Sequence, residues 1–231
     1  SSNLKGERAI SYNLSADYYA KKYQFSINLF RTNLKDKIQF SPADDEVKKF
    51  GYSYQWENVD DAYVQGVELG AKASIARNLT AGVNWTFNQG KFKHERADWS
   101  DPNDETVKEF PQRLQYAKDS RNISRFPAMT GDIDLDYTPG TWTFSLTSSL
   151  QGRMFIDYNS EDDGATSKIK KTNTFMIFNC RAAKRFGTCT VYAGAKNIFS
   201  YIQDEKHTDD AAFMYAPVYG ATWYIGLSVK L

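Results

Sequence analysis

Apolar and polar residues alternate one by one along much of this chain, and a period of two is typical of β-strands with one apolar face. The closing stretch ATWYIGLSVKL keeps this alternation to its last residue. Its apolar side chains share one parity: Trp223, Ile225, Leu227, Val229 and Leu231. The same pattern predicts nine strands, at roughly 9–21, 23–40, 52–76, 79–95, 125–138, 141–158, 172–186, 189–202 and 217–231. No stretch predicts an amphipathic helix with comparable clarity, so the predicted fold class is all-β.

The connections between these strands alternate strictly between short and long. The short connections are tight turns at Lys21-Lys22, Arg77-Asn78, Pro139-Gly140 and Gly187-Thr188. The long connections are polar and lie around 41–51, 94–124, 159–171 and 203–216. In a chain of hairpins this order brings all short turns to one end of the sheet and all long loops to the other. Such sorting predicts an antiparallel meander and is typical of transmembrane β-barrels, with short periplasmic turns and long outer loops.

Composition narrows the choice of environment and partner. The mean hydropathy is −0.60, and no apolar run approaches the length of about 20 residues that a membrane helix needs. Aromatic residues make up 15% of the chain, which favours strands. The net charge of +1 leaves no basic surplus for a nucleic-acid partner. The sequence also contains no catalytic constellation, so an enzyme is not predicted.

The polar faces of the predicted strands favour a barrel over a soluble sandwich. They are rich in Ser, Thr, Asn, Gly and Asp, which suits a crowded, hydrated interior. The strand predicted at 141–158 is also longer than the usual 3–10 residues of globular sheets. A soluble all-β sandwich remains the alternative. In a barrel, the residues expected to face lipid are Trp85, Ile133, Leu146, Leu227 and Val229, and those expected to face the interior are Asn84, Asp134, Thr147 and Ser228.

Several stretches resemble the TonB-dependent outer-membrane transporters. AKNIFSY (195–201) is similar to a signature on the penultimate strand of that family, through Asn197, Ile198 and Phe199. The stretch 219–231 resembles the closing strand, with Leu231 where Phe is usual. Four further stretches match in order and spacing: NLKGERAISYNLSADYY, FSINLFRTNLKDKI, AYVQGVELGAKASI and RFPAMTGDIDLDY.

The resemblance implies an architecture larger than nine strands. Barrels of this kind have about 22 strands around a plugged lumen, and single-chain bacterial barrels have even strand numbers. Residues 1–231 are therefore expected to be the C-terminal strands of a transmembrane barrel, without its plug domain and earlier strands. A nine-stranded segment has two open edges, so it is not expected to fold as an autonomous unit.

The resemblance also implies a function, which is active transport across the outer membrane of a Gram-negative bacterium. The expected cargo is a scarce bulky nutrient such as a ferric siderophore, cobalamin or haem. The expected partners are outer-membrane lipid, the protein's own plug domain, the TonB complex and the metal-chelate ligand, with a surface lipoprotein as a further candidate. A passive porin, or a structural or adhesive barrel, is the alternative.

Ligand contact is expected from outer loops and from the barrel interior. Rings on outer loops can grip a bulky ligand, although anchoring at the membrane interface is nearly as good an explanation of them. Arg153 and Gln151 have the parity of the interior, where contact with the plug is the first expectation. The candidate ligand-binding residues are Trp99, Phe110, Arg153, Tyr158, Phe213 and Tyr215.

No cofactor or metal site is predicted. His94 and His207 lie in separate loops, so solvation is favoured over ligation of a metal or haem. The acidic stretches at 43–46, 101–105, 160–164 and 208–210 offer carboxylates for Ca²⁺, but none has the spacing of a calcium-binding loop. Cys180 and Cys189 have the apolar parity and lie too far apart along their strands for a disulfide, so two thiols facing lipid are expected.

Overall fold

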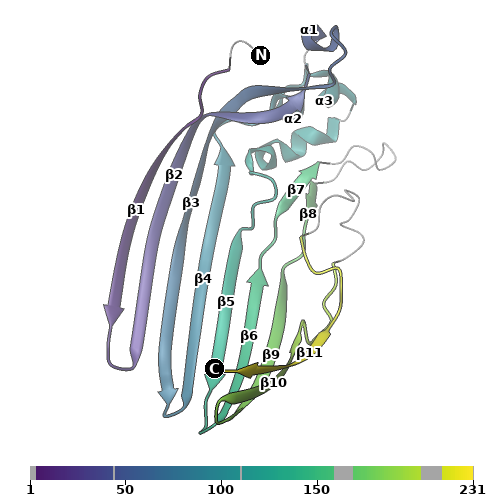
Figure 1. The fold of residues 1–231 in the computed structure, drawn as a ribbon. Helices are drawn as coiled ribbons and strands as arrows, with labels where there is room; N and C mark the ends of the chain where they lie inside the picture. The colour runs from purple at the N-terminus through teal and green to yellow at the C-terminus, as the bar shows by residue number, and fades with distance from the viewer. Residues whose placement is uncertain (1–3, 44, 110, 159–168, 204–214, 231) are drawn as a thin grey trace.

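The computed structural model describes residues 4–43, 45–109, 111–158, 169–203 and 215–230 and contains a nine-stranded antiparallel sheet (Figure 1). Neighbours in the sheet follow one another along the chain, as the alternation of short and long connections predicted. The strands, in the order in which they pair, are β1 (Arg8–Tyr19), β2 (Tyr23–Pro42), β3 (Tyr54–Ala76), β4 (Leu79–Phe92), β5 (Met129–Tyr137), β6 (Trp142–Gln151), β9 (Phe175–Phe186), β10 (Cys189–Lys196) and β11 (Thr222–Val229).

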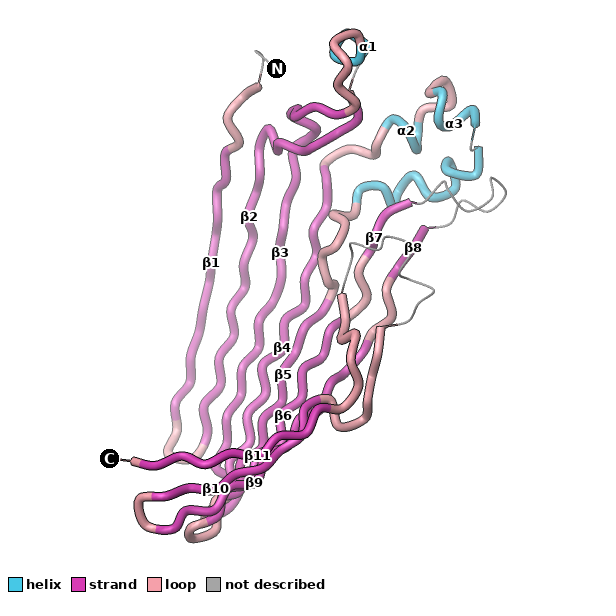
Figure 2. The backbone as a smooth tube through the Cα atoms, turned by 45° about the vertical axis from the view of Figure 1, so that its right-hand side comes forward, coloured by secondary structure: helices cyan, strands magenta, loops and turns pink. Residues whose placement is uncertain are grey.

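The sheet is curved and open, with β1 at one edge and β11 at the other. We call the end with the four tight turns the turn end, and the opposite end the loop end. The smaller elements all lie toward the loop end (Figure 2). They are a hairpin of β7 (Phe155–Tyr158) with β8 (Ile169–Lys171), the helices α1 (Asp45–Lys48), α2 (Ala97–Ser100) and α3 (Glu105–Glu109), and the 3₁₀ helix η1 (Pro111–Arg121). None of the helices in the described residues has the length and apolarity required to span a membrane.

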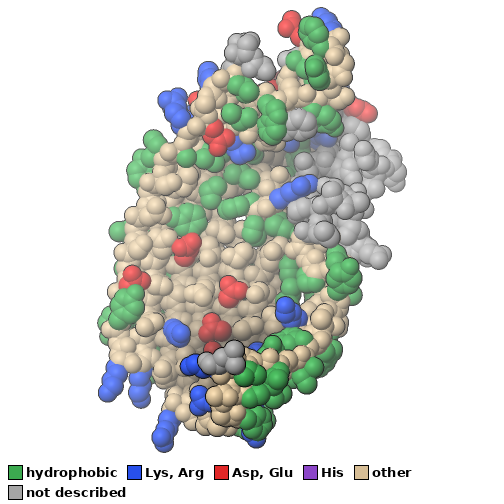
Figure 3. Space-filling model, viewed as in Figure 1, with side chains coloured by type: hydrophobic (Ala, Val, Ile, Leu, Met, Phe, Trp, Pro, Cys, Tyr) green, Lys and Arg blue, Asp and Glu red, His purple; other side chains and the backbone are tan. Residues whose placement is uncertain are grey.

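The strand register confirms the predicted facing of side chains. Leu29 lies opposite Val67, and Val67 opposite Phe87, so these three share what we call the outer face. The next residues along the strands, Asn28 and Glu68, pair on the other side, which we call the hollow face. Figure 3 looks into this hollow and shows acidic and basic side chains along its lower half. All nine residues whose facing was predicted lie on the expected side, because residues paired in antiparallel strands share a face.

The hollow face is held together by hydrogen bonds between side chains of neighbouring strands. In β5 and β6, Ser145 Oγ donates to Asp136 Oδ1 at 2.6 Å and Ser149 Oγ donates to Asp132 Oδ1 at 3.0 Å. Similar bonds join β1 to β2 and β2 to β3: Ser11–Thr32, Ser15–Asn28 and Asn28–Glu68, all at 2.9 Å. These bonds pair polar side chains of neighbouring strands across the hollow, while Phe30, Leu34 and Val64 share the same face nearer the loop end.

The outer face has an apolar band with distinct borders. At the turn end aromatic rings stack, with ring centroids 6.3 Å apart in Tyr137–Phe144 and 5.5 Å apart in Trp142–Phe144. Toward the loop end the band stops one row beyond Leu29, Val67 and Phe87, where three polar side chains bond across the strands. Arg31 Nη1 donates to Gln65 Oε1 at 2.8 Å, and Gln65 Nε2 donates to Gln89 Oε1 at 2.9 Å.

Within the band, Trp85 lies over a glycine of the neighbouring strand. Gly131 is directly opposite Trp85, and a Cβ at Gly131 would lie 2.6 Å from the indole ring. A side chain at this position would displace the ring, so the glycine is required by the close approach of its neighbour.

Several strands are shorter than the sequence predicted: β5 begins at Met129 and not near 125, and β11 begins at Thr222 and not near 217. Two of the shortened strands have a local cause that the structure shows. The strand expected at 141–158 ends at Gln151, and the chain resumes as β7, which pairs with β8 outside the main sheet. The break is at Gly152, whose N–H donates to the Met129 carbonyl at 2.7 Å. A Cβ at Gly152 would lie 2.9 Å from that same oxygen, so only glycine permits the close approach. The prediction of one continuous strand was wrong because alternation persists beyond the last residue that the sheet can pair.

The strand expected at 189–202 is also interrupted, at Asn197. This buried residue has φ 50°, and its side-chain amide donates to the carbonyls of Tyr201 (2.7 Å) and Tyr219 (3.1 Å). Its Oδ1 accepts from the Tyr201 N–H at 2.9 Å. Asparagine tolerates positive φ and supplies both a donor and an acceptor, so Asn197 closes the turn after β10 and ties it to the approach to β11.

The two cysteines are free thiols, as the sequence predicted. Cys180 lies opposite Leu146, and Cys189 opposite Phe186 and Val229, so both belong to the outer face.

Candidate functional site

The long connection between β4 and β5 folds into a helical cap at the loop end. The short elements α2, α3 and η1 pack around Trp99 and Val107, which are 1% and 2% exposed. The Trp99 ring contacts Phe155 of β7 edge-on, with centroids 6.1 Å apart, and the Arg113 guanidinium lies 5.8 Å from the Trp99 ring centroid. Trp99 therefore joins the cap to the β7–β8 hairpin.

A second apolar cluster holds the connection between β10 and β11. It is built on Met154, Phe175 and Tyr215, all buried. Tyr201 stacks on Phe175 with centroids 5.0 Å apart. Gln203 Oε1 accepts from the backbone N–H of Tyr215 at 2.8 Å and so fixes the end of this connection against its beginning.

The segment 151–155 links the two clusters and carries the candidate Arg153. Phe155 contacts Trp99 of the first cluster, and Met154 belongs to the second. Gln151 Nε2 donates to the Tyr215 carbonyl at 3.2 Å. Arg153 is exposed between them, while its carbonyl accepts from the Ala128 N–H at 3.1 Å. The backbone of Arg153 is thus fixed and its guanidinium is accessible to solvent.

The structure places three of the six candidate residues around this segment, and these three differ in their exposure to solvent. Trp99 and Tyr215 are covered by protein, so in this conformation their rings support the loop end and are not presented to a ligand. Arg153 is the exposed member. Tyr158 lies in β7 by its backbone, but its side chain is outside the described part of the structure, as are Phe110 and Phe213.

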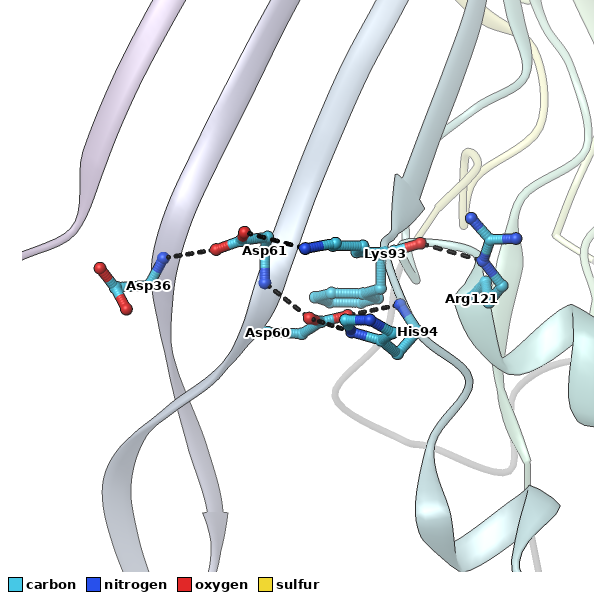
Figure 4. Close-up of polar contacts among 7 residues, drawn as sticks. Asp36, Asp60, Asp61, Lys93, His94 and Arg121 are labelled. Atoms are coloured by element: carbon cyan, nitrogen blue, oxygen red, sulfur yellow. Dashed lines mark hydrogen bonds and ion pairs between the residues drawn. The ribbon is translucent and has the colours of Figure 1, made fainter.

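A polar cluster anchors the start of the helical cap to β3 (Figure 4). Asp60 Oδ2 accepts from the His94 N–H at 2.7 Å, and its Oδ1 bonds the His94 ring nitrogen Nδ1 at 2.9 Å. Next to it, Asp61 forms an ion pair with Lys93 at 3.8 Å. Arg121, at the end of η1, donates from Nε to the Phe92 carbonyl at 3.1 Å.

These contacts shift the pKa of Asp60, which lies beyond the apolar band. Burial of the carboxyl acts to raise its pKa, but the hydrogen bonds from the His94 backbone and ring and from the Asp61 N–H act in the opposite direction and outweigh it. The pKa of Asp60 is therefore below its ordinary value. The carboxylate is held ionised, and His94 is engaged by it.

The described residues contain no group of three or more His, Cys, Asp or Glu side chains arranged to hold a metal ion. In the acidic stretch 101–105, Asp101 Oδ1 instead accepts from the Asn103 N–H at 2.9 Å, which forms an Asx turn before α3. His207 and the stretches 160–164 and 208–210 lie outside the described residues.

The helical cap and the roles of Gln203 and Asp60 were not predicted from the sequence. The Asx turn at Asp101–Asn103 is a local signal for a helix start that was available in the sequence. Gln203 and Asp60 act through contacts with residues 12 and 34 positions away, and no local pattern reports such contacts.

The fold and its two faces define the class: an open segment of an antiparallel β-barrel with a polar hollow. A model of the TonB dependent receptor-like β-barrel family matches residues 1–198, and the chain belongs to this family.

Solved structures of similar fold belong to longer chains. The copper transporter OprC has a TM-score of 0.67 at 20% identity, over 97% of this chain and 32% of that one. The ferric citrate transporter FecA in its unliganded form has a TM-score of 0.66 at 17% identity, over 96% of this chain and 31% of that one. The siderophore receptor PirA from Pseudomonas aeruginosa has a TM-score of 0.61 at 17% identity, over 98% of this chain and 30% of that one. The chain therefore spans about a third of the length of each.

Proposed function

We propose that this chain is part of the barrel wall of a transporter in the outer membrane of a Gram-negative bacterium, which takes up a scarce bulky nutrient using energy delivered by TonB. Family membership supports this proposal, and the open edges at β1 and β11 suit a segment of a wider barrel. The apolar outer band suits contact with lipid, and the turn end corresponds to the periplasmic side. The remaining strands, the plug domain and the TonB-contacting segment belong to the full-length protein in this proposal.

The polar hollow is the observation that carries the proposal. Its carboxylates and hydroxyls are paired along the wall but remain open to solvent, as in Asp132–Ser149 and Asp136–Ser145. Such a wall can hold a hydrated plug through hydrogen bonds that are exchangeable with water, which allows the plug to rearrange without leaving buried polar groups unpaired.

Ligand capture is assigned to the loop end. Arg153 is the proposed direct contact, because it is exposed on a fixed backbone and its guanidinium suits the carboxylate, catecholate or phosphate groups of metal chelates and related nutrients. Trp99 and Tyr215 are proposed to position it from either side. Phe110, Tyr158 and Phe213 remain candidates for direct contact. A ferric siderophore, cobalamin and haem are the ligand classes to compare.

Uptake by cells that express the full-length protein tests the proposal. We expect accumulation of one labelled ligand from this panel, and its loss when a protonophore removes the energy source. Arg153→Ala should weaken binding of that ligand by about tenfold or more, as for a lost hydrogen bond to a charged group. The matched control is Arg77→Ala, an exposed arginine at the turn end, which should leave affinity unchanged.

A passive porin or a structural or adhesive barrel is the competing function. It predicts permeation of small solutes that is insensitive to the protonophore, or no permeation. If either result were found and the protein bound no ferric siderophore, cobalamin or haem, the passive or structural function would be correct and energised uptake would be wrong.

A further inference from the structure

A groove of about 470 Å³ runs along the outer face between β6 and β11. Its floor is made of small side chains on β9 and β10, namely Cys180, Ala182 and Ala193. Phe144 and Leu146 form one wall and Trp223 the other. The paired rows explain the shape, because Phe144 lies opposite Ala182 and Ala182 opposite Ala193, so two small residues separate large ones.

A lysine lies one row beyond this groove, on the side of the turn end. Lys184 is the next residue after Ala182 on the same face of β9. Its Nζ is 4.7 Å from the Trp142 ring centroid and 5.0 Å from that of Phe186. No carboxylate in the described part of the chain pairs with it.

This charge is unusual for its surroundings. In the described residues of β5, β6, β9, β10 and β11, Lys184 is the only charged side chain on the outer face. A cation on an apolar wall is costly unless it reaches the polar interface or a counter-ion. The turn end is also basic at its tips, where exposed cations include Lys21, Lys22, Arg77, Arg185 and Lys230.

We propose that this groove binds one anionic phospholipid of the leaflet next to the turn end, with an acyl chain between Phe144 and Trp223 and its phosphate at Lys184. This proposal rests on the membrane placement given above. An apolar groove that ends at a single cation framed by two rings matches the shape of a phospholipid, which has an apolar chain and a negative headgroup. The basic tips favour an anionic lipid through the same attraction.

Lipid titration of the full-length protein in mild detergent, followed by native mass spectrometry, provides the test. The probes are phosphatidylglycerol and phosphatidylcholine with identical acyl chains. The wild-type protein should prefer phosphatidylglycerol. Lys184→Gln should weaken the binding of phosphatidylglycerol by about fivefold, because one interfacial cation is removed. The two lipids should then bind with similar affinity. Ala182→Phe should fill the groove and weaken the binding of both lipids by about fivefold or more.

The matched control is Lys230→Gln, which removes an exposed cation at the same end and should keep the wild-type preference. Lys230 follows the outer-face residue Val229, so it has the parity of the hollow face. Heat modifiability of each variant reports whether the barrel has folded, and Lys184→Gln is conservative enough to keep the test valid if Ala182→Phe does not fold. An unchanged preference in folded Lys184→Gln overturns the proposed site.

Quenching of tryptophan fluorescence by brominated acyl chains in vesicles distinguishes failure of the lipid site from failure of the membrane placement. Quenching with no dependence on Lys184 overturns only the lipid site. Absence of quenching in vesicles overturns the membrane placement and the lipid site with it.

Discussion

The wall of the barrel and its loop end are stabilised in different ways. In the wall, each side chain belongs to a row across the strands, such as Leu29, Val67 and Phe87, and each row repeats the same chemistry. At the loop end, single residues carry the packing, with Trp99 and Val107 in one cluster and Tyr215 in another. Loss of one residue from a row leaves its neighbours paired, whereas loss of a cluster residue removes the contact that holds two segments together.

The difference indicates where function can vary. A wall built from repeated rows fixes register and facing with many equivalent contacts, so it tolerates substitutions of the same polarity. A loop end held by a few buried side chains can rearrange when those contacts open, which suits ligand capture. Substitutions in the wall and at the loop end should therefore differ in their effects.

The largest effect is expected from Trp99→Ala. Removing a fully buried indole should cost about 3–5 kcal/mol of local stability, because the cap would lose its contact with Phe155. Hydrogen exchange in the full-length protein should show faster exchange in 97–121, with the strands of the wall unchanged.

The matched control is Trp56→Ala, since this loop-end indole is 56% exposed and should affect exchange much less. If Trp99→Ala and Trp56→Ala gave equal exchange, the cap would not depend on its buried indole. If instead the whole sheet lost protection, wall and loop end would form one cooperative unit.

The second prediction concerns the wall. Leu146→Arg places a charge on the outer face and should cost about 2–4 kcal/mol near the middle of the bilayer, whereas Thr147→Arg points into the hollow and should be tolerated. The measurement is folding of the full-length barrel into vesicles, followed by heat modifiability. Equal tolerance at the two positions would mean that the outer face does not contact lipid.

The wall was predictable from the sequence because its information is local. A period of two assigns Leu146 and Thr147 to opposite faces without reference to any other strand, and tight turns such as Gly187-Thr188 fix the hairpin register. The ends of strands were predicted less well, since alternation continues past Gln151 whereas pairing stops where Gly152 approaches Met129.

The candidate site was predicted only in part. Trp99 and Tyr215 were predicted to contact a ligand as rings on outer loops, and the structure buries both. No local pattern reports this burial, because it depends on contacts with Phe155 and Phe175 from distant segments. Arg153 is exposed, and its role as a ligand contact stays a prediction. Nothing in the local sequence around Asp60 reports its bond to His94.

The smallest expected effect is the pH dependence of the Asp60–His94 anchor. The folded-state pKa of Asp60 lies below its unfolded value of about 3.9. The ionised carboxylate therefore contributes stability that is fully present above about pH 4 and is lost as the pH falls through the folded-state pKa. Because the site is partly solvated, we expect a contribution below about 1 kcal/mol.

Exchange of the His94 amide, normalised for the intrinsic effect of pH, measures this contribution. The amide should be more protected in the wild type than in Asp60→Asn at pH 7, and the two should converge as the pH falls through the folded-state pKa of Asp60 and the wild-type carboxyl is protonated. Glu95→Gln removes an exposed carboxylate next to His94 and should behave as wild type. If the His94 amide in Asp60→Asn showed the same pH-dependent protection as in the wild type, the charge of Asp60 would not hold the cap to β3. The cap would then depend on Trp99 and Arg121, and the loop end would open only when its buried packing is lost.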